Sequence, residues 1–205
     1  LPDLQPRCWI PIFLFAIAVW PLMVTGQQLR PSNPIALVGA QLLDGYESAP
    51  ISRSTIVFDK GQIIAIGSRD DILLPVNTEV IDVGGYTILP GLIDAHVHLD
   101  LIGHGSYARY YSFLEDTNRL IKVMSIAAKQ MLRAGVTTAL DLGAPFVILD
   151  VREKIEQGEI PGPRLLTSGP WLTRQEYDTI PDTYQMVIES PTEGAEKVLE
   201  LIKKG

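Results

Sequence analysis

A change in hydrophobic periodicity near residue 91 constrains the fold of this chain more than any other feature. Residues 35–90 form short apolar runs separated by turn residues, a pattern typical of a small β-sandwich or barrel. From residue 91 onward, short strand-like runs alternate with longer helical patterns. Such alternation indicates parallel strands joined by crossover helices. The sequence therefore predicts a β-sandwich segment over 35–90 and an α/β domain over 91–205.

The β segment contains one clear hairpin signal. Residues 55–58 and 62–66 are largely apolar, and they flank the turn sequence Asp59-Lys60-Gly61, which predicts two antiparallel strands. The mostly apolar run Ile35–Leu43, which ends before Asp44-Gly45, predicts a further strand.

The second segment predicts three strands and three helices. The strands are expected at 91–99, 136–142 and 164–168, and the helices at 117–135, 146–157 and 191–205. Residues 169–190 are expected to form a long loop. Ser190 and Glu193 fit a capping box, with Pro191 at the first helical position.

Two α/β architectures begin in this way, a doubly wound sheet and a (β/α)8 barrel. No glycine-rich phosphate loop follows the first strand, which counts against a nucleotide-binding sheet. A complete barrel needs about 250 residues. We therefore expect the N-terminal part of a (β/α)8 TIM barrel, with about three βα units, so that 91–205 is an incomplete barrel.

The first strand of this segment carries two histidines. Because side chains alternate along a strand, Asp94, His96 and His98 are expected to face the same side. Two imidazoles one strand repeat apart are suited to a shared metal ion. A histidine pair of this spacing also fits ordinary polar residues in a half-buried strand, although burying it without hydrogen bonds or a metal would be costly.

The sequence around the histidines resembles the amidohydrolase superfamily. Residues 89–98 (LPGLIDAHVH) resemble the start of that family's barrel, and residues 135–143 (GVTTALDLG) resemble its second strand. Residues 162–169 (GPRLLTSG) resemble the third strand of the branch that contains imidazolonepropionase-like and prolidase-like enzymes. Residues 35–90 look like the family's N-terminal sandwich half, so the resemblance covers about residues 35–205.

This resemblance implies that His96 and His98 are ligands of a divalent metal, with Zn²⁺ as the expected ion and one or two ions in the complete enzyme. The family's other ligands belong to later strands. No catalytic residue is therefore assigned within this chain, which we expect to be a fragment that is inactive alone. The implied reaction is hydrolysis, by metal-activated water, of carbon–nitrogen bonds in small amides, lactams or dipeptides.

Three other polar residues are candidates for supporting roles. Asp94 is placed either to orient an imidazole or to bond to the backbone, and His104 lies in the loop after the first strand. Asp141 ends the second strand, where a role in fixing a loop is favoured over one in substrate organisation. A group of aromatic residues is expected to cover the seam between sandwich and barrel rather than to line a pocket: Tyr107, Tyr110, Tyr111 and Phe113.

Two other functions remain open from the sequence. A non-catalytic relative would keep the scaffold for binding or assembly, and a deacetylase or deaminase would use the same scaffold for another reaction. The net charge of −7 provides no basic surface for nucleic acid. Oligomerisation is compatible with the sequence.

Residues 1–26 differ from the rest of the chain. Arg7 precedes an uncharged apolar run that ends in small residues before Gln27, which is typical of a secretory signal peptide. An uncleaved membrane anchor is the alternative and would be the chain's only contact with a membrane. Residues 27–34 are expected to form a linker. We therefore expect an exported protein, periplasmic or extracellular, or else a membrane-anchored one.

Overall fold

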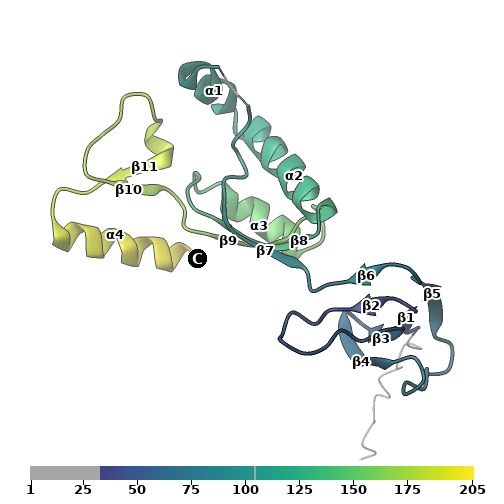
Figure 1. The fold of residues 1–205 in the computed structure, drawn as a ribbon. Helices are drawn as coiled ribbons and strands as arrows, with labels where there is room; N and C mark the ends of the chain where they lie inside the picture. Colours follow the sequence, from purple (N-terminus) through teal and green to yellow (C-terminus); the bar gives the residue numbers. More distant parts are fainter. Residues whose placement is uncertain (1–32, 104) are drawn as a thin grey trace, which may run out of the picture. The chain divides into compact units, whose positions relative to one another are not determined.

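The computed structural model describes residues 33–103 and 105–205 (Figure 1). The predicted leader, most of the linker and His104 lie outside these residues. The described residues form two compact units: residues 33–40 with Arg53–Gly84, and Gln41–Ser52 with Gly85–Gly205. Across the described part of the chain, no helix has the length and apolar character needed to cross a membrane.

The first unit is built on a mixed four-stranded sheet in the order β4-β3-β1-β5. The strands are β1 (Ile35–Val38), β3 (Ser54–Asp59), β4 (Gln62–Ser68) and β5 (Glu79–Asp82). The predicted hairpin is confirmed, because β3 and β4 pair antiparallel. Lys60 and Gly61 both have positive φ, 51° and 77°, as the twist of a tight two-residue turn requires.

The strand predicted over residues 35–43 is wrong in its extent. The chain leaves β1 after Val38 and turns at Gly39, whose φ is +93°. It then enters β2 (Gln41–Leu42), which pairs in parallel with β6 (Thr87–Ile88) and belongs to the second unit. A positive φ at Gly39 redirects the chain, so a single apolar run supplies strands to two different sheets.

The second unit contains a parallel sheet in the order β7-β8-β9. Its strands are β7 (Leu92–Val97), β8 (Val136–Asp141) and β9 (Arg164–Thr167). The helices are α1 (Tyr107–Leu114), α2 (Thr117–Arg133), α3 (Ile148–Glu156) and α4 (Pro191–Lys204). In Figure 1, α2 and α3 lie beside the sheet, and α2 contacts β8 while α3 contacts β9. The three strands pair in parallel, as their alternation with helices predicted.

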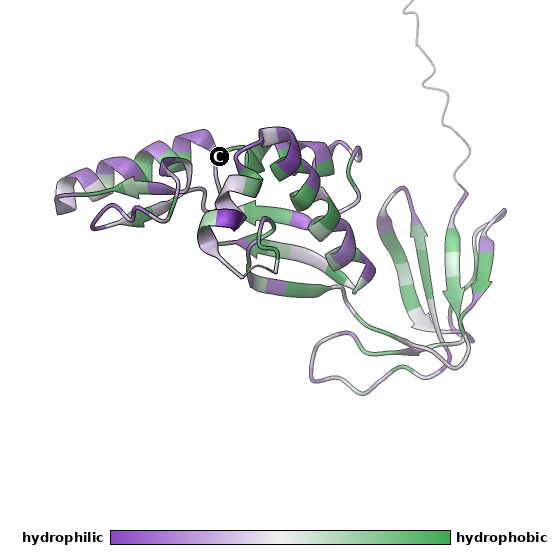
Figure 2. Cartoon of the chain, turned by 90° about the horizontal axis from the view of Figure 1, so that it is seen from above, coloured by the Kyte–Doolittle hydropathy of each residue, from purple (hydrophilic) through white to green (hydrophobic). Residues whose placement is uncertain are grey.

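The sequence also accounts for where these helices begin and end. The Asp116 carboxylate caps α2 by accepting hydrogen bonds from the backbone N–H groups of Asn118 and Arg119, and Gly135 follows the helix with φ +89°. The Ser190 hydroxyl accepts from the Glu193 N–H at the start of α4. Figure 2 shows apolar and hydrophilic residues mixed along the helices, as expected for helices with one face toward a core.

Three expectations in the second unit need correction. The first strand ends at Val97, so His98 lies just beyond it. Helix α1 occupies a region for which no helix was predicted. The expected loop 169–190 contains β10 (Trp171–Thr173), the short 3-10 helix η1 (Asp182–Tyr184) and β11 (Gln185–Val187). Strands β10 and β11 pair with each other, and such short strands leave little periodicity in the sequence.

The expectation for the aromatic group is corrected for two of its four members, while Tyr107 and Phe113 are exposed. Tyr110 and Tyr111 are buried in the core of the second unit, in one cluster with Leu99 and Tyr184. Two consecutive aromatic residues on α1 fill the space beside the turn after β7. Tyr110 and Tyr111 therefore belong to the interior of the second unit.

Candidate metal centre

His96 and His98 lie side by side at the carboxyl end of β7. Their ring centroids are 5.3 Å apart, and the ring planes meet at 75°. His96 is exposed and His98 is half-buried. Two imidazoles that share a tetrahedral ion at about 2.1 Å have centroids about 5 Å apart. The pair as folded therefore fits two ligands of one ion.

No cluster of three or more His, Cys, Asp or Glu side chains suited to an ion occurs within residues 33–103 and 105–205. In these residues the candidate centre thus consists of two imidazoles. Two neutral nitrogen ligands suit Zn²⁺ and related ions, but they fill only half of a tetrahedral shell.

The orientation of the His98 ring is set by the loop after β8. His98 Nδ1 lies 3.4 Å from the carbonyl oxygen of Gly143. A carbonyl only accepts hydrogen bonds, so a hydrogen bond here requires the proton on Nδ1, and in the neutral imidazole this leaves the lone pair on Nε2. This arrangement, in which one ring nitrogen is held by the protein, is the usual support for a histidine that binds metal through the other.

Trp171 of β10 holds the same ring from another side. Its ring meets His98 edge to face, with centroids 6.2 Å apart and an interplanar angle of 80°. The indole is itself fixed, because Nε1 donates a 2.9 Å hydrogen bond to the carbonyl oxygen of Leu142. His98 is therefore positioned by two segments that are distant from it in sequence.

Gly143 is required at this point because Trp171 lies directly against its backbone. A Cβ atom on Gly143 would lie 1.7 Å from Trp171 Nε1, far inside van der Waals contact. The absence of a side chain at residue 143 thus permits both the indole hydrogen bond and the approach of the Gly143 carbonyl to His98.

Replacing Gly143 with alanine is expected to displace Trp171 and to weaken metal binding by the intact protein by about 10- to 100-fold. This is the range measured when a metal ligand loses a residue that orients it. Competition with a chromogenic chelator measures the affinity. Gly103→Ala is the matched control, because a Cβ there meets nothing within 4 Å. Equal affinities of the Gly143→Ala variant and the wild type would contradict this role.

Asp141 connects the two loops that flank His98. Its buried carboxylate accepts a 2.8 Å hydrogen bond from the Leu99 N–H through Oδ2 and a 3.0 Å bond from the Gly143 N–H through Oδ1. Burial raises the pKa of Asp141, an effect that the two backbone donors oppose. The carboxylate thus fixes the turn after β7 to the loop after β8.

The other two candidates from the sequence are less closely connected to the pair. Asp94 Oδ1 accepts a 3.2 Å hydrogen bond from the backbone N–H of His96, so its recorded bond is to the backbone and not to an imidazole. His104 lies outside the described residues.

A small cavity lies next to His98. This cavity, of about 210 Å³, is bordered by the His98 ring, the turn after β7, helix α1 and β10. Its lining residues are His98, Asp100, Leu101, Tyr107, Tyr110, Tyr111, Gly143 and Trp171. The cluster of tyrosines in the sequence was a signal that could have indicated this cavity. Trp171 gave no such signal, because it lay in a segment predicted to be a loop.

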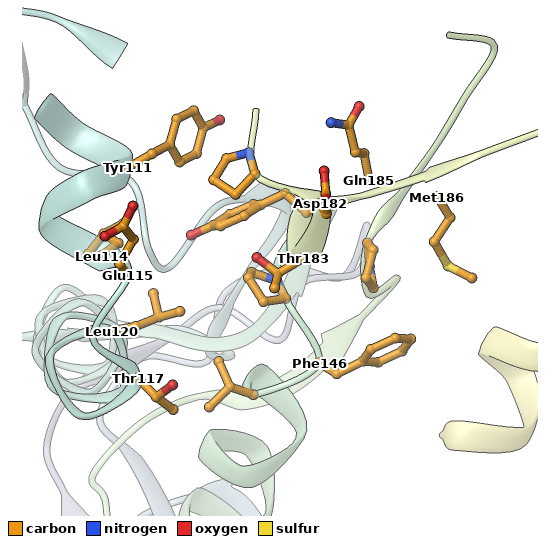
Figure 3. Close-up of a pocket in the computed structure, with 15 residues that line it drawn as sticks. Tyr111, Leu114, Glu115, Thr117, Leu120, Phe146, Asp182, Thr183, Gln185 and Met186 are labelled. Carbon is orange, nitrogen blue, oxygen red and sulfur yellow. The ribbon is translucent and has the colours of Figure 1, made fainter. Parts of the chain in front are cut away.

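A larger cavity of about 550 Å³ lies beyond Tyr111, which borders both (Figure 3). Apolar side chains dominate its wall. In Figure 3, Tyr111, Leu114 and Leu120 lie on one side, and Phe146 and Met186 lie on the other. Its volume lies within the range of small-molecule sites.

Comparison with known proteins defines the class to which this fold and site belong. The model of the amidohydrolase family matches residues 87–205, more than half of the chain. The chain belongs to the amidohydrolase family, and the resemblance seen in its sequence is confirmed. Its fold is accordingly a partial α/β TIM barrel preceded by mixed β structure.

Three proteins illustrate how similar this chain is to individual relatives. The chain is 31% identical to an enamidase of Eubacterium barkeri over 108 residues, which are 53% of this chain and 24% of the enamidase. It is 34% identical to an imidazolonepropionase of Symbiobacterium thermophilum over 61 residues, 28% of this chain and 14% of that protein. A putative prolidase from Bifidobacterium longum superposes with a TM-score of 0.67 and 27% identity, over 84% of this chain and 39% of the prolidase.

The matched region is therefore less than half the length of each of these proteins. This chain is an amidohydrolase by family.

Proposed function

We propose that the intact protein is a metal-dependent hydrolase of carbon–nitrogen bonds, other than internal peptide bonds, in small amides, cyclic amides or dipeptides. The observation that carries this proposal is the separation of the His96 and His98 rings, 5.3 Å, which matches two ligands of one ion. Relatives named enamidase, imidazolonepropionase and prolidase support the substrate class.

The residues described here would bind the metal ion and orient one of its ligands. His96 and His98 would bind a divalent ion, for which we propose Zn²⁺. A bound ion would supply a water of lowered pKa and polarise the carbonyl group. The Gly143 carbonyl keeps the proton on His98 Nδ1, and Trp171 limits rotation of the ring.

The remaining ligands are proposed to come from parts of the protein outside this chain. Two imidazoles leave the coordination shell incomplete, and we propose that the 205-residue chain alone binds metal weakly and does not turn over substrate. The segment over 35–90 would then be one part of the family's β-sandwich, and 91–205 the first three βα units of its barrel.

Metal removal tests the proposed function. In the intact protein, dialysis against a chelator is expected to lower hydrolysis of Xaa-Pro dipeptides or of a lactam by at least about 100-fold, because the activated water is lost. Restoring Zn²⁺ is expected to recover the rate. Release of the product amine or opening of the lactam ring measures the reaction.

Two results would contradict this proposal. Metal binding without hydrolysis of any amide, lactam or dipeptide would favour the non-catalytic alternative. Release of ammonia from an amino-substituted heterocycle, again without amide hydrolysis, would favour a deaminase.

A further inference from the structure

We propose that Asp100 is a positioning residue for His98 and that it acts through the hydroxyl groups of Tyr110 and Tyr184. This inference rests on the proposed metal centre. The inference assigns a role to a buried carboxylate that is not one of the proposed metal ligands.

The Asp100 carboxylate joins three segments of the second unit. Asp100 is 3% exposed and lies two residues after His98. Its Oδ2 accepts a 2.8 Å hydrogen bond from the Tyr110 hydroxyl of α1 and another 2.8 Å bond from the Tyr184 hydroxyl of η1. The Tyr110 hydroxyl also lies 3.2 Å from the Asp100 carbonyl oxygen. One carboxylate oxygen therefore fixes the turn after β7 to α1 and η1.

Both tyrosines are suited to act as permanent donors. Burial raises the pKa of Tyr110 and of Tyr184 above the ordinary value, and the Asp100 carboxylate adds to this effect. The hydroxyl groups therefore stay protonated under physiological conditions. Hydrogen bonds from neutral donors to a buried carboxylate are stronger than those between neutral groups.

A second connection runs from Asp100 to His98 through packed rings. Tyr184 lies 6.1 Å from Trp171 between centroids, and Trp171 contacts the His98 ring. The bond to Asp100 fixes Tyr184 and thereby supports the indole against His98. Asp100 thus restrains His98 along the chain and across the cavity.

Tyr111 provides a matched control in the same cluster. Its ring lies 4.8 Å from Tyr110 and 5.2 Å from Tyr184, between centroids. Among the described residues, its hydroxyl is not a donor to Asp100. Tyr111→Phe and Tyr184→Phe therefore remove the same group from adjoining rings, and only Tyr184→Phe removes a bond to Asp100.

The experiment measures metal affinity of the intact protein by chelator competition, together with the visible spectrum of the Co²⁺-loaded form. Tyr184→Phe is expected to weaken Zn²⁺ binding by about 10-fold and to alter the Co²⁺ spectrum, whereas Tyr111→Phe changes affinity less than about 2-fold. Thermal melting of the metal-free proteins identifies a loss of folding. Tyr110→Phe supplies a second variant and is expected to act in the same direction.

A double-mutant cycle tests whether Tyr184 acts through Asp100. The combined Asp100→Asn and Tyr184→Phe variant is expected to lose less affinity than the product of the single losses, since both changes disrupt one interaction. Independent effects, unchanged metal affinity of Tyr184→Phe, or an equal effect of Tyr111→Phe would overturn this inference alone. A wild-type protein that binds no metal through His98 would overturn the proposed function as well.

Discussion

Replacing His98 with alanine in the intact protein is expected to weaken metal binding by more than about 100-fold. This is a larger loss than is typical for a residue that only orients a metal ligand. Hydrolysis is expected to fall in parallel. His96→Ala should have the same effect, because each change removes one of two imidazoles in a pair whose spacing suits one ion. Elemental analysis after dialysis at limiting free metal measures the occupancy.

The third histidine of the chain supplies the control. His104 follows the strand in sequence and is not part of the predicted ligand pair, so His104→Ala should retain metal. Full occupancy and unchanged affinity in His96→Ala or His98→Ala would contradict the ligand assignment. Loss of metal in all three variants would show that the effect is not specific to the pair.

Replacing Asp141 with alanine is expected to lower the free energy of unfolding by about 2–5 kcal/mol. The change leaves the backbone N–H groups of Leu99 and Gly143 without their recorded acceptor, and each unsatisfied buried donor costs about 1–3 kcal/mol. Chemical denaturation of the intact, metal-free protein measures the loss. Asp141→Asn should cost less, since an amide oxygen still accepts one of the two bonds.

Asp94→Ala is the matched control for this prediction. Asp94 has one recorded bond, a longer 3.2 Å contact to the exposed residue His96, so its loss is expected to cost less than about 1 kcal/mol. Equal stabilities of Asp141→Ala and the wild type would show that the two loops do not depend on this carboxylate.

Local signals allowed much of the fold to be predicted. Asp116 and Gly135 mark the two ends of α2, and Ser190 marks the beginning of α4, because capping depends on residues close in sequence. The parallel pairing of β7, β8 and β9 followed from their alternation with helices. Gly39 shows the limit, since a single positive φ divided an apolar run between two sheets.

The candidate site was predictable only in its histidines. His96 and His98 are close in sequence, so alternation along the chain placed them together. His98 is held in place by Gly143 and Trp171, which lie 45 and 73 positions further along the chain. Such contacts depend on tertiary packing and have no local pattern. Asp100 and Tyr184 meet for the same reason, across 84 residues.

Anomalous diffraction from crystals of the intact, metal-loaded protein tests the central claim most directly. The account predicts an anomalous peak bonded to one nitrogen of His96 and to Nε2 of His98, each at about 2.0–2.1 Å, with His98 Nδ1 still facing the Gly143 carbonyl. A metal bound elsewhere, with neither imidazole among its ligands, would contradict it.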